Sequence, residues 1–111
     1  MTRILTSLAM LAALVPALGQ AGNVERGREK SVVCQACHGP DGNGVGDPQY
    51  PVLAGQYADY LAHALRSYLN GERQNVIMQG FVATLSEQDI RDLSAFYAAQ
   101  SGPLGDLRDL K

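Results

Sequence analysis

The chain contains two cysteines, Cys34 and Cys37, and a histidine, His38, follows the second of them directly. Cysteines at positions i and i+3 lie about one helical turn apart, so both sulfurs can reach the two vinyl groups along one edge of a porphyrin and form thioether bonds. The imidazole of the next residue then lies beneath the ring, where it can bind iron. This Cys-x-x-Cys-His pattern is typical of covalent attachment of c-type haem.

Three other kinds of site use the same side chains. A thioredoxin-like redox pair needs a strand–helix–strand context, and the sequence shows no strand pattern. A disulfide across so short a loop adds little stability. A zinc site needs four ligands, which would be Cys34, Cys37, His38 and His63. Because His63 falls on the polar side of its predicted helix, and adjacent Cys37 and His38 fit one tetrahedron poorly, we favour haem over these three alternatives.

Iron bound by His38 has a second axial position, for which His63 and Met78 are the candidates. Met1 and Met10 belong to the predicted leader described below. A lone methionine often only fills space in a core, but Met78 lies in a segment of weak regularity between two predicted helices. A chain that crosses the open face of the ring would have this character. The residues favour Met78, and a His/Met pair raises the reduction potential of a c-type haem.

The first 21 residues predict a secretory signal peptide. A basic start at Arg3 precedes an apolar run over residues 4–15, and small residues allow cleavage after Gly19 or Ala21. The run is shorter than a bilayer-spanning helix, although a retained anchor is the alternative. Cleavage predicts a periplasmic protein with no membrane span, in keeping with haem attachment outside the cytoplasm. Loss of Arg3 makes the formal net charge of −2 one unit more negative, which argues against nucleic-acid binding.

After the leader we predict one domain, residues 22–103, and leave the tail at residues 104–111 unassigned. Asn23 caps a predicted helix over residues 24–33 that runs on into the cysteine motif. The Gly- and Pro-rich stretch 39–55 predicts a long loop, of the kind that wraps around something. A domain this small, without tryptophan, has only a modest apolar core of its own, so an additional apolar body at its centre would stabilise it.

Apolar side chains at i, i+3, i+4 and i+7 predict a helix over residues 57–69 that ends at Asn70-Gly71. Residues 72–85 are ambiguous between a helical turn and a loop. A capping box at Ser86, with Asp89 in the place of the usual glutamate, predicts the start of a last helix. The inner side of this helix is predicted to carry Ile90, Leu93, Phe96 and Tyr97, before a stop at residues 100–103. These segments indicate an all-α domain.

With these features the sequence resembles the class I c-type cytochromes, and most of all the small bacterial periplasmic members whose domain also occurs duplicated in two-haem proteins. The haem motif is highly specific, and the other matches are individually weak but follow the family's order. The matching segments are Gly27, Cys34–Gly39, Asp41-Gly42, Pro51–Gln56, Tyr60-Leu61, Gly71–Arg73, Met78, Leu85-Ser86 and Leu93–Tyr97.

The resemblance implies a class I cytochrome c fold, with helices packed around one covalent haem c. It implies attachment of that haem at Cys34 and Cys37 and iron ligation by His38 and Met78. It also implies that the carbonyl of Pro51 accepts a hydrogen bond from the proximal imidazole and fixes the orientation of that ring.

Two further positions are read through the resemblance. Gly27 matches the glycine that lets the first helix cross the last against an aromatic side chain, here Phe96 or Tyr97. His63 departs from the family, where glutamine or another polar residue is expected, and its exposed position makes the change a small one.

If protein ligands fill both axial positions, a substrate cannot reach the iron. We therefore expect a monomeric one-electron carrier rather than an enzyme, which docks transiently on redox proteins that donate and accept electrons. The alternatives are the cytochrome subunit of a periplasmic dehydrogenase and, if Met78 is replaceable, a haem sensor or weak peroxidase.

Overall fold

The structure, a computed structural model, describes residues 21–104. Its elements are α1 (Val24–Lys30), the 3₁₀ helix η1 (Ser31–Cys34), α2 (Gln35–His38), α3 (Ala58–Asn70), α4 (Val76–Val82) and α5 (Glu87–Ala98). This part of the chain holds no strand, so the all-α prediction is confirmed. None of its helices is both long and apolar enough to cross a membrane. The predicted signal peptide up to residue 20, and residues 105–111 of the tail, lie outside the described residues.

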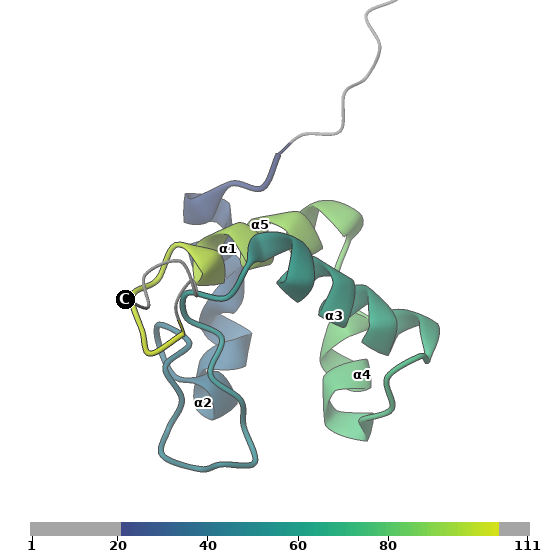
Figure 1. The fold of residues 1–111 in the computed structure, drawn as a ribbon. Helices are drawn as coiled ribbons and strands as arrows, with labels where there is room; N and C mark the ends of the chain where they lie inside the picture. Colours follow the sequence, from purple (N-terminus) through teal and green to yellow (C-terminus); the bar gives the residue numbers. More distant parts are fainter. Residues whose placement is uncertain (1–20, 105–111) are drawn as a thin grey trace, which may run out of the picture.

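Helices α1 and α5 cross at the top of the fold in Figure 1, and Gly27 lies at the crossing, against Asp92 and Phe96. A Cβ atom on Gly27 would lie 2.6 Å from the Cβ of Phe96 and closer still to the carbonyl oxygen of Asp92. Both atoms belong to the body of α5, so neither can rotate away. The close crossing predicted from Gly27 is confirmed, and Phe96 is the aromatic residue that it packs against.

The buried carboxylate of Asp92 joins the two crossing helices through hydrogen bonds. Its side chain is only 3% exposed and accepts hydrogen bonds from the Asn23 backbone N–H at 2.8 Å, Arg26 Nε at 3.0 Å and Gln88 Nε2 at 2.8 Å. Burial by itself would raise the pKa of this carboxyl. The bonds from Arg26, Asn23 and Gln88 outweigh burial and leave the pKa of Asp92 below its ordinary value.

The chain from α1 to α2 is helical throughout, but it is not one α-helix as predicted. The α-helix ends at Lys30, and a 3₁₀ turn leads into the cysteine motif. The Ser31 hydroxyl donates to the carbonyl of Arg28 at 2.7 Å, a local bond that competes with regular helix geometry. Val32 and Val33 follow, and their β-branched side chains crowd the preceding turn of an α-helix.

Helix α5 begins and packs as predicted. The Ser86 hydroxyl accepts from the Asp89 N–H at 3.0 Å, and the Asp89 carboxylate accepts from the Ser86 N–H at 3.0 Å, which completes the capping box. The four residues predicted for its inner side are all buried, and three of them form the core with one residue of α3. That core consists of Leu61, Leu93, Phe96 and Tyr97.

Helices α3 and α4 form the second half of the fold. Helix α3 stops at Gly71, whose φ of 83° is the left-handed conformation that favours glycine. The segment left ambiguous in the sequence then forms α4, because the Asn75 side chain accepts from the N–H groups of Ile77 and Met78, both at 3.0 Å. This N-cap fixes where α4 begins and therefore where Met78 lies.

Between α2 and α3 the chain runs as a loop, as predicted for residues 39–55. The carbonyl of Gly42 accepts from the N–H groups of Leu53 at 2.7 Å and Ala54 at 3.1 Å, which closes the loop on itself. Gly42 has a φ of 81°, and a Cβ there would come within 2.7 Å of the Tyr97 ring. The base of the loop, where Gly42 meets Leu53 and Ala54, is thus fixed against α5. Residues between them, from Gln49 onward, form part of the cavity wall described below.

Candidate cofactor site

The helices and the loop surround a cavity of about 500 Å³, a volume within the usual range for small-molecule and cofactor sites, about 300–1,000 Å³. Helix α2 and the loop lie on one side of it, and α3 and α4 lie on the other (Figure 1). Most of its lining is apolar or aromatic, including Val52, Leu53, Leu61, Leu65, Tyr68 and Phe81. Such a cavity suits a large apolar ligand with few polar groups.

Cys34 and Cys37 both line this cavity, and both are partly buried free thiols. Burial is the main cause that raises the pKa of the Cys34 thiol; the nearby Tyr97 hydroxyl acts in the opposite direction, and the nearby Cys37 raises the pKa further. Cys34 is therefore a protonated thiol at neutral pH. Cys34 ends η1 and Cys37 lies in α2, so the two residues are about one helical turn apart, as their spacing predicts.

His38 is buried, with 7% of its surface exposed, and its Nδ1 lies 3.0 Å from the carbonyl oxygen of Pro51. A carbonyl can only accept, so Nδ1 carries the proton and Nε2 keeps its free electron pair. The contact expected between His38 and Pro51 is present. It fixes the orientation of an imidazole that lines the cavity and leaves one nitrogen able to bind a metal.

Met78 is half-buried in α4 and lines the same cavity as His38. Helices α2 and α4 lie on opposite sides of that cavity (Figure 1). The structure therefore brings the imidazole and the thioether to one site from opposite walls, with the two cysteines beside the imidazole.

The zinc set considered from the sequence is not assembled. His63 lies on the exposed side of α3, where its carbonyl accepts from the Ser67 hydroxyl at 2.9 Å, and it does not line the cavity. In residues 21–104 no three His, Cys, Asp or Glu side chains gather as a metal site would require. Two thiols, one oriented imidazole and one thioether around an apolar cavity fit a covalently held haem instead.

Sequence reasoning missed part of the cavity wall. The apolar stripe of α3 predicted a helix but no role in a site, yet its residues Tyr60, Leu65 and Tyr68 line the cavity, and Tyr60 is 51% exposed. Arg73 and Ile77 also line it, and neither was assigned a role. For Ile77 the sequence did offer a signal, because Asn75 before an apolar triplet is a good helix cap and predicts that a helix begins there.

Comparison with known proteins agrees with this geometry. The family model for cytochrome c matches residues 24–99, which include every element from α1 to α5. The chain belongs to the cytochrome c family. Haem c, bound covalently, is accordingly its cofactor.

Cytochrome c4 of Pseudomonas aeruginosa is 37% identical over 105 residues, which are 95% of this chain and 52% of that protein. Cytochrome c-554(548) of Halomonas halodenitrificans is 40% identical over 83 residues, 72% of this chain and 99% of that protein. The crystal structure of reduced recombinant cytochrome c4 from Pseudomonas stutzeri superposes with a TM-score of 0.70 at 38% identity, covering 77% of this chain and 49% of that one. The chain thus spans about half the length of the cytochromes c4 that it matches.

Proposed function

We propose that this chain carries single electrons between redox proteins, with haem c attached at Cys34 and Cys37 and its iron held by His38 and Met78. The observation that carries the proposal is the approach of His38 and Met78 from opposite walls of one apolar cavity that both cysteines also line. Bound in this way, haem c supplies a one-electron iron couple whose potential the axial pair and the surrounding burial tune.

The residues around the site are suited to transfer rather than catalysis. The bond to Pro51 holds the His38 ring in one orientation and one tautomer. The Asn75 cap holds the first turn of α4, and with it Met78. With His38 and Met78 occupying both axial positions, the protein would leave no vacancy for a substrate, so we propose that it is not an enzyme.

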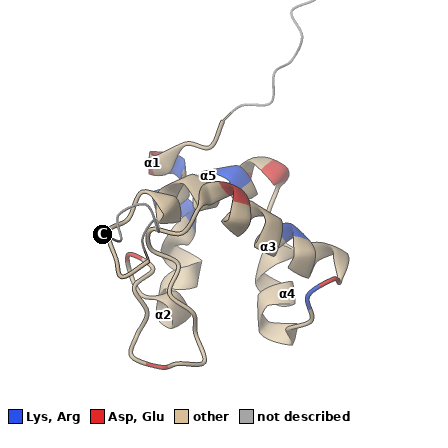
Figure 2. Ribbon diagram, viewed as in Figure 1, with Lys and Arg blue, Asp and Glu red and all other residues tan. Residues whose placement is uncertain are grey.

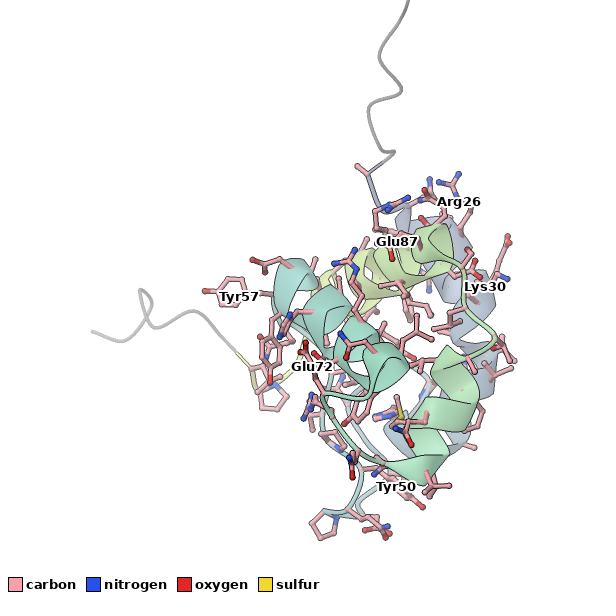
Figure 3. All side chains as sticks on the ribbon, turned by 90° about the vertical axis from the view of Figure 1, so that its right-hand side faces the viewer. Arg26, Lys30, Tyr50, Tyr57, Glu72 and Glu87 are labelled. Carbon is pink, nitrogen blue, oxygen red and sulfur yellow. The ribbon has the colours of Figure 1, made fainter. Side chains whose placement is uncertain are left out.

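Electrons would pass where the cavity meets the surface. Val33, Ile77 and Phe81 line the cavity and are also 59%, 49% and 41% exposed. Helices α2 and α4 carry no charged side chain (Figure 2). In Figure 3 the labelled Arg26, Lys30 and Glu87 lie at the end of the molecule away from Tyr50, which lines the cavity. The apolar, uncharged surface that α2 and α4 present beside the cavity suits brief encounters with other redox proteins.

We place the carrier in the periplasm as a monomer. The basic start, short apolar run and small-residue cleavage site of the first 21 residues support export. A covalent c-type haem supports the same location, because attachment takes place outside the cytoplasm.

A second candidate is a cytochrome subunit held permanently to a periplasmic dehydrogenase. Val32 and Val76 favour it, because they are 63% and 86% exposed and lie beyond the cavity lining. Gel filtration of a periplasmic extract separates the two. A carrier elutes as one small haem protein, whereas a subunit elutes with a catalytic protein at a fixed ratio.

The test of the main proposal is an optical spectrum of the purified protein, oxidised and reduced. We expect a haem that organic solvent does not extract and the weak far-red band of a methionine–ferric bond. Met78→Ala should keep the covalent haem, lose that band and let the reduced protein bind carbon monoxide. Gln79→Ala, one residue along α4 and outside the cavity lining, is the control and should leave all three properties unchanged. A far-red band that survives in Met78→Ala would refute the ligand assignment.

A further inference from the structure

The cations of the described chain are almost all paired with carboxylates. Six Lys and Arg side chains lie within residues 21–104, and five of them form ion pairs. The pairs are Arg26–Asp92, Arg28–Glu25, Lys30–Asp89, Arg66–Glu87 and Arg91–Glu87. In this range Arg73 is the exception, and an unpaired guanidinium needs an explanation.

Arg73 also differs from the other five in its position. It lines the cavity, and no other Lys, Arg, Asp or Glu of the described residues does so. Its guanidinium carbon lies 4.8 Å from the centre of the Tyr68 ring, which lines the cavity too. Its backbone N–H donates to the carbonyl of Ser67 at 3.0 Å. Ring stacking and this backbone bond hold the cation at the cavity wall without any acid to neutralise it.

Given the proposed attachment of haem at Cys34 and Cys37, the ligand of this cavity brings its own anions. Haem c carries two propionate groups on pyrroles other than the two that form the thioethers, so they point away from the cysteines. Arg73 lines the cavity and stands in the connection between α3 and α4, and Figure 2 shows that this connection lies across the fold from α2. We propose that Arg73 binds a haem propionate.

The fork of a guanidinium matches a carboxylate with two parallel hydrogen bonds, which an ammonium cannot provide. An arginine within a few ångströms lowers the pKa of a carboxyl by about one to three pH units. The bound propionate would therefore stay ionised across the neutral range and would contribute no pH dependence to the midpoint potential there.

Other groups around the cavity do not produce such a dependence. The titratable side chains that line it besides Arg73 are Cys34, Cys37, His38, Tyr50, Tyr60 and Tyr68. In the holoprotein the two cysteines would be thioethers and His38 would be an iron ligand, so these three side chains would not titrate in the neutral range. A pH dependence of the potential that appears in an Arg73 variant and not in the wild type therefore reports on the propionates.

The experiment compares Arg73→Gln with Arg66→Gln in the holoprotein. Both variants remove one positive charge, but Arg66 pairs with Glu87 and does not line the cavity. The pKa of each haem propionate is measured by ¹³C NMR, and the midpoint potential is measured from pH 5 to 9. In Arg73→Gln we expect one propionate pKa to rise by about one to three pH units and the potential to become pH-dependent in the acid half of this range. Arg66→Gln should match the wild type in both measurements.

Unchanged propionate pKa values in Arg73→Gln would overturn the proposal, and so would an equal rise in Arg66→Gln. If Arg73 instead binds a carboxylate of a docking partner, Arg73→Gln leaves the propionates unchanged and weakens only partner binding. Arg73→Lys keeps the charge without the fork and should show a smaller rise than Arg73→Gln. If the wild type lacks covalent haem or the far-red band, the proposed function is wrong. If the wild type has both, and the propionate pKa values in Arg73→Gln are unchanged, only this inference is wrong.

Discussion

Gly27→Ala tests the crossing on which the fold depends. Helix α1 carries the chain into the cysteine motif, and α5 supplies most of the core, so their separation sets the position of the haem motif relative to that core. An added Cβ at Gly27 would overlap the Asp92 carbonyl and lie 2.6 Å from the Phe96 Cβ. The two helices would have to move apart to make room.

The magnitude follows from two opposing effects. Alanine in a helix interior is favoured over glycine by about 1 kcal/mol. Overpacking a closely packed contact costs about 1–3 kcal/mol, and the upper end applies because the obstructing atoms of Asp92 and Phe96 cannot rotate away. The net loss in the free energy of unfolding should be about 2 kcal/mol, which for a domain of this size lowers the midpoint temperature by roughly 10 °C.

The assay is denaturant unfolding of the holoprotein followed by far-ultraviolet circular dichroism. Gly80→Ala is the matched control, because Gly80 is also helical, in α4, and a Cβ there meets nothing within 4 Å. That variant should be more stable than wild type by up to about 1 kcal/mol. If Gly27→Ala were as stable as Gly80→Ala, the close crossing would not constrain the fold and the reasoning would be wrong.

Two further predictions concern charge. Because its partners hold the pKa of Asp92 below the ordinary value, its carboxylate stabilises the fold above the unfolded pKa, and this contribution disappears as the pH falls through the native pKa. In urea denaturation, Asp92→Asn should therefore lower the free energy of unfolding by about 1–2 kcal/mol at pH 7 and by much less near pH 3. An equal loss at both pH values would mean that the charge of Asp92 does not stabilise the fold. At the cavity mouth, electron self-exchange between oxidised and reduced copies, measured by NMR line broadening, should depend little on salt. Ile77→Glu should slow it about fivefold at low salt through like-charge repulsion of about 1 kcal/mol, and added salt should restore the rate. A rate in Ile77→Glu that equals the wild type at low salt would place the exchange surface elsewhere.

The features that the sequence predicted well are those decided by local chemistry. The capping box of Ser86 and Asp89 depends only on two side chains and the turn between them, and it formed as expected. The stop after Asn70 followed from Gly71, which adopts the left-handed conformation. Gly27 predicted a close crossing because a glycine in a helix loses stability unless packing uses the space.

The features that escaped prediction depend on tertiary packing. Helix α4 has seven residues, and a helix that short is not stable by propensity alone; the Asn75 cap and packing against α3 make it form. The apolar stripe of α3 predicted the helix correctly, but it did not show what that face of the helix contacts. Periodicity does not distinguish a face buried in the core from one that lines a cavity. Arg73 lies outside any regular element, so its position at the cavity follows only from how α3 and α4 pack.

The placement of charge connects these observations. The other cations of residues 21–104 are paired with acids of α1 and α5, while the α2 and α4 surfaces beside the cavity carry no charged side chain. Paired charges contribute little field at a distance, so these five cations would affect the potential of a haem in this cavity less than its ligands, its burial and Arg73. If a propionate neutralises Arg73, the mouth that partners touch has no uncompensated side-chain cation. We therefore expect an encounter there to depend on apolar contact more than on electrostatic steering. The weak salt dependence of self-exchange tests this at the surface, and the propionate pKa tests the neutralisation of Arg73 inside the cavity.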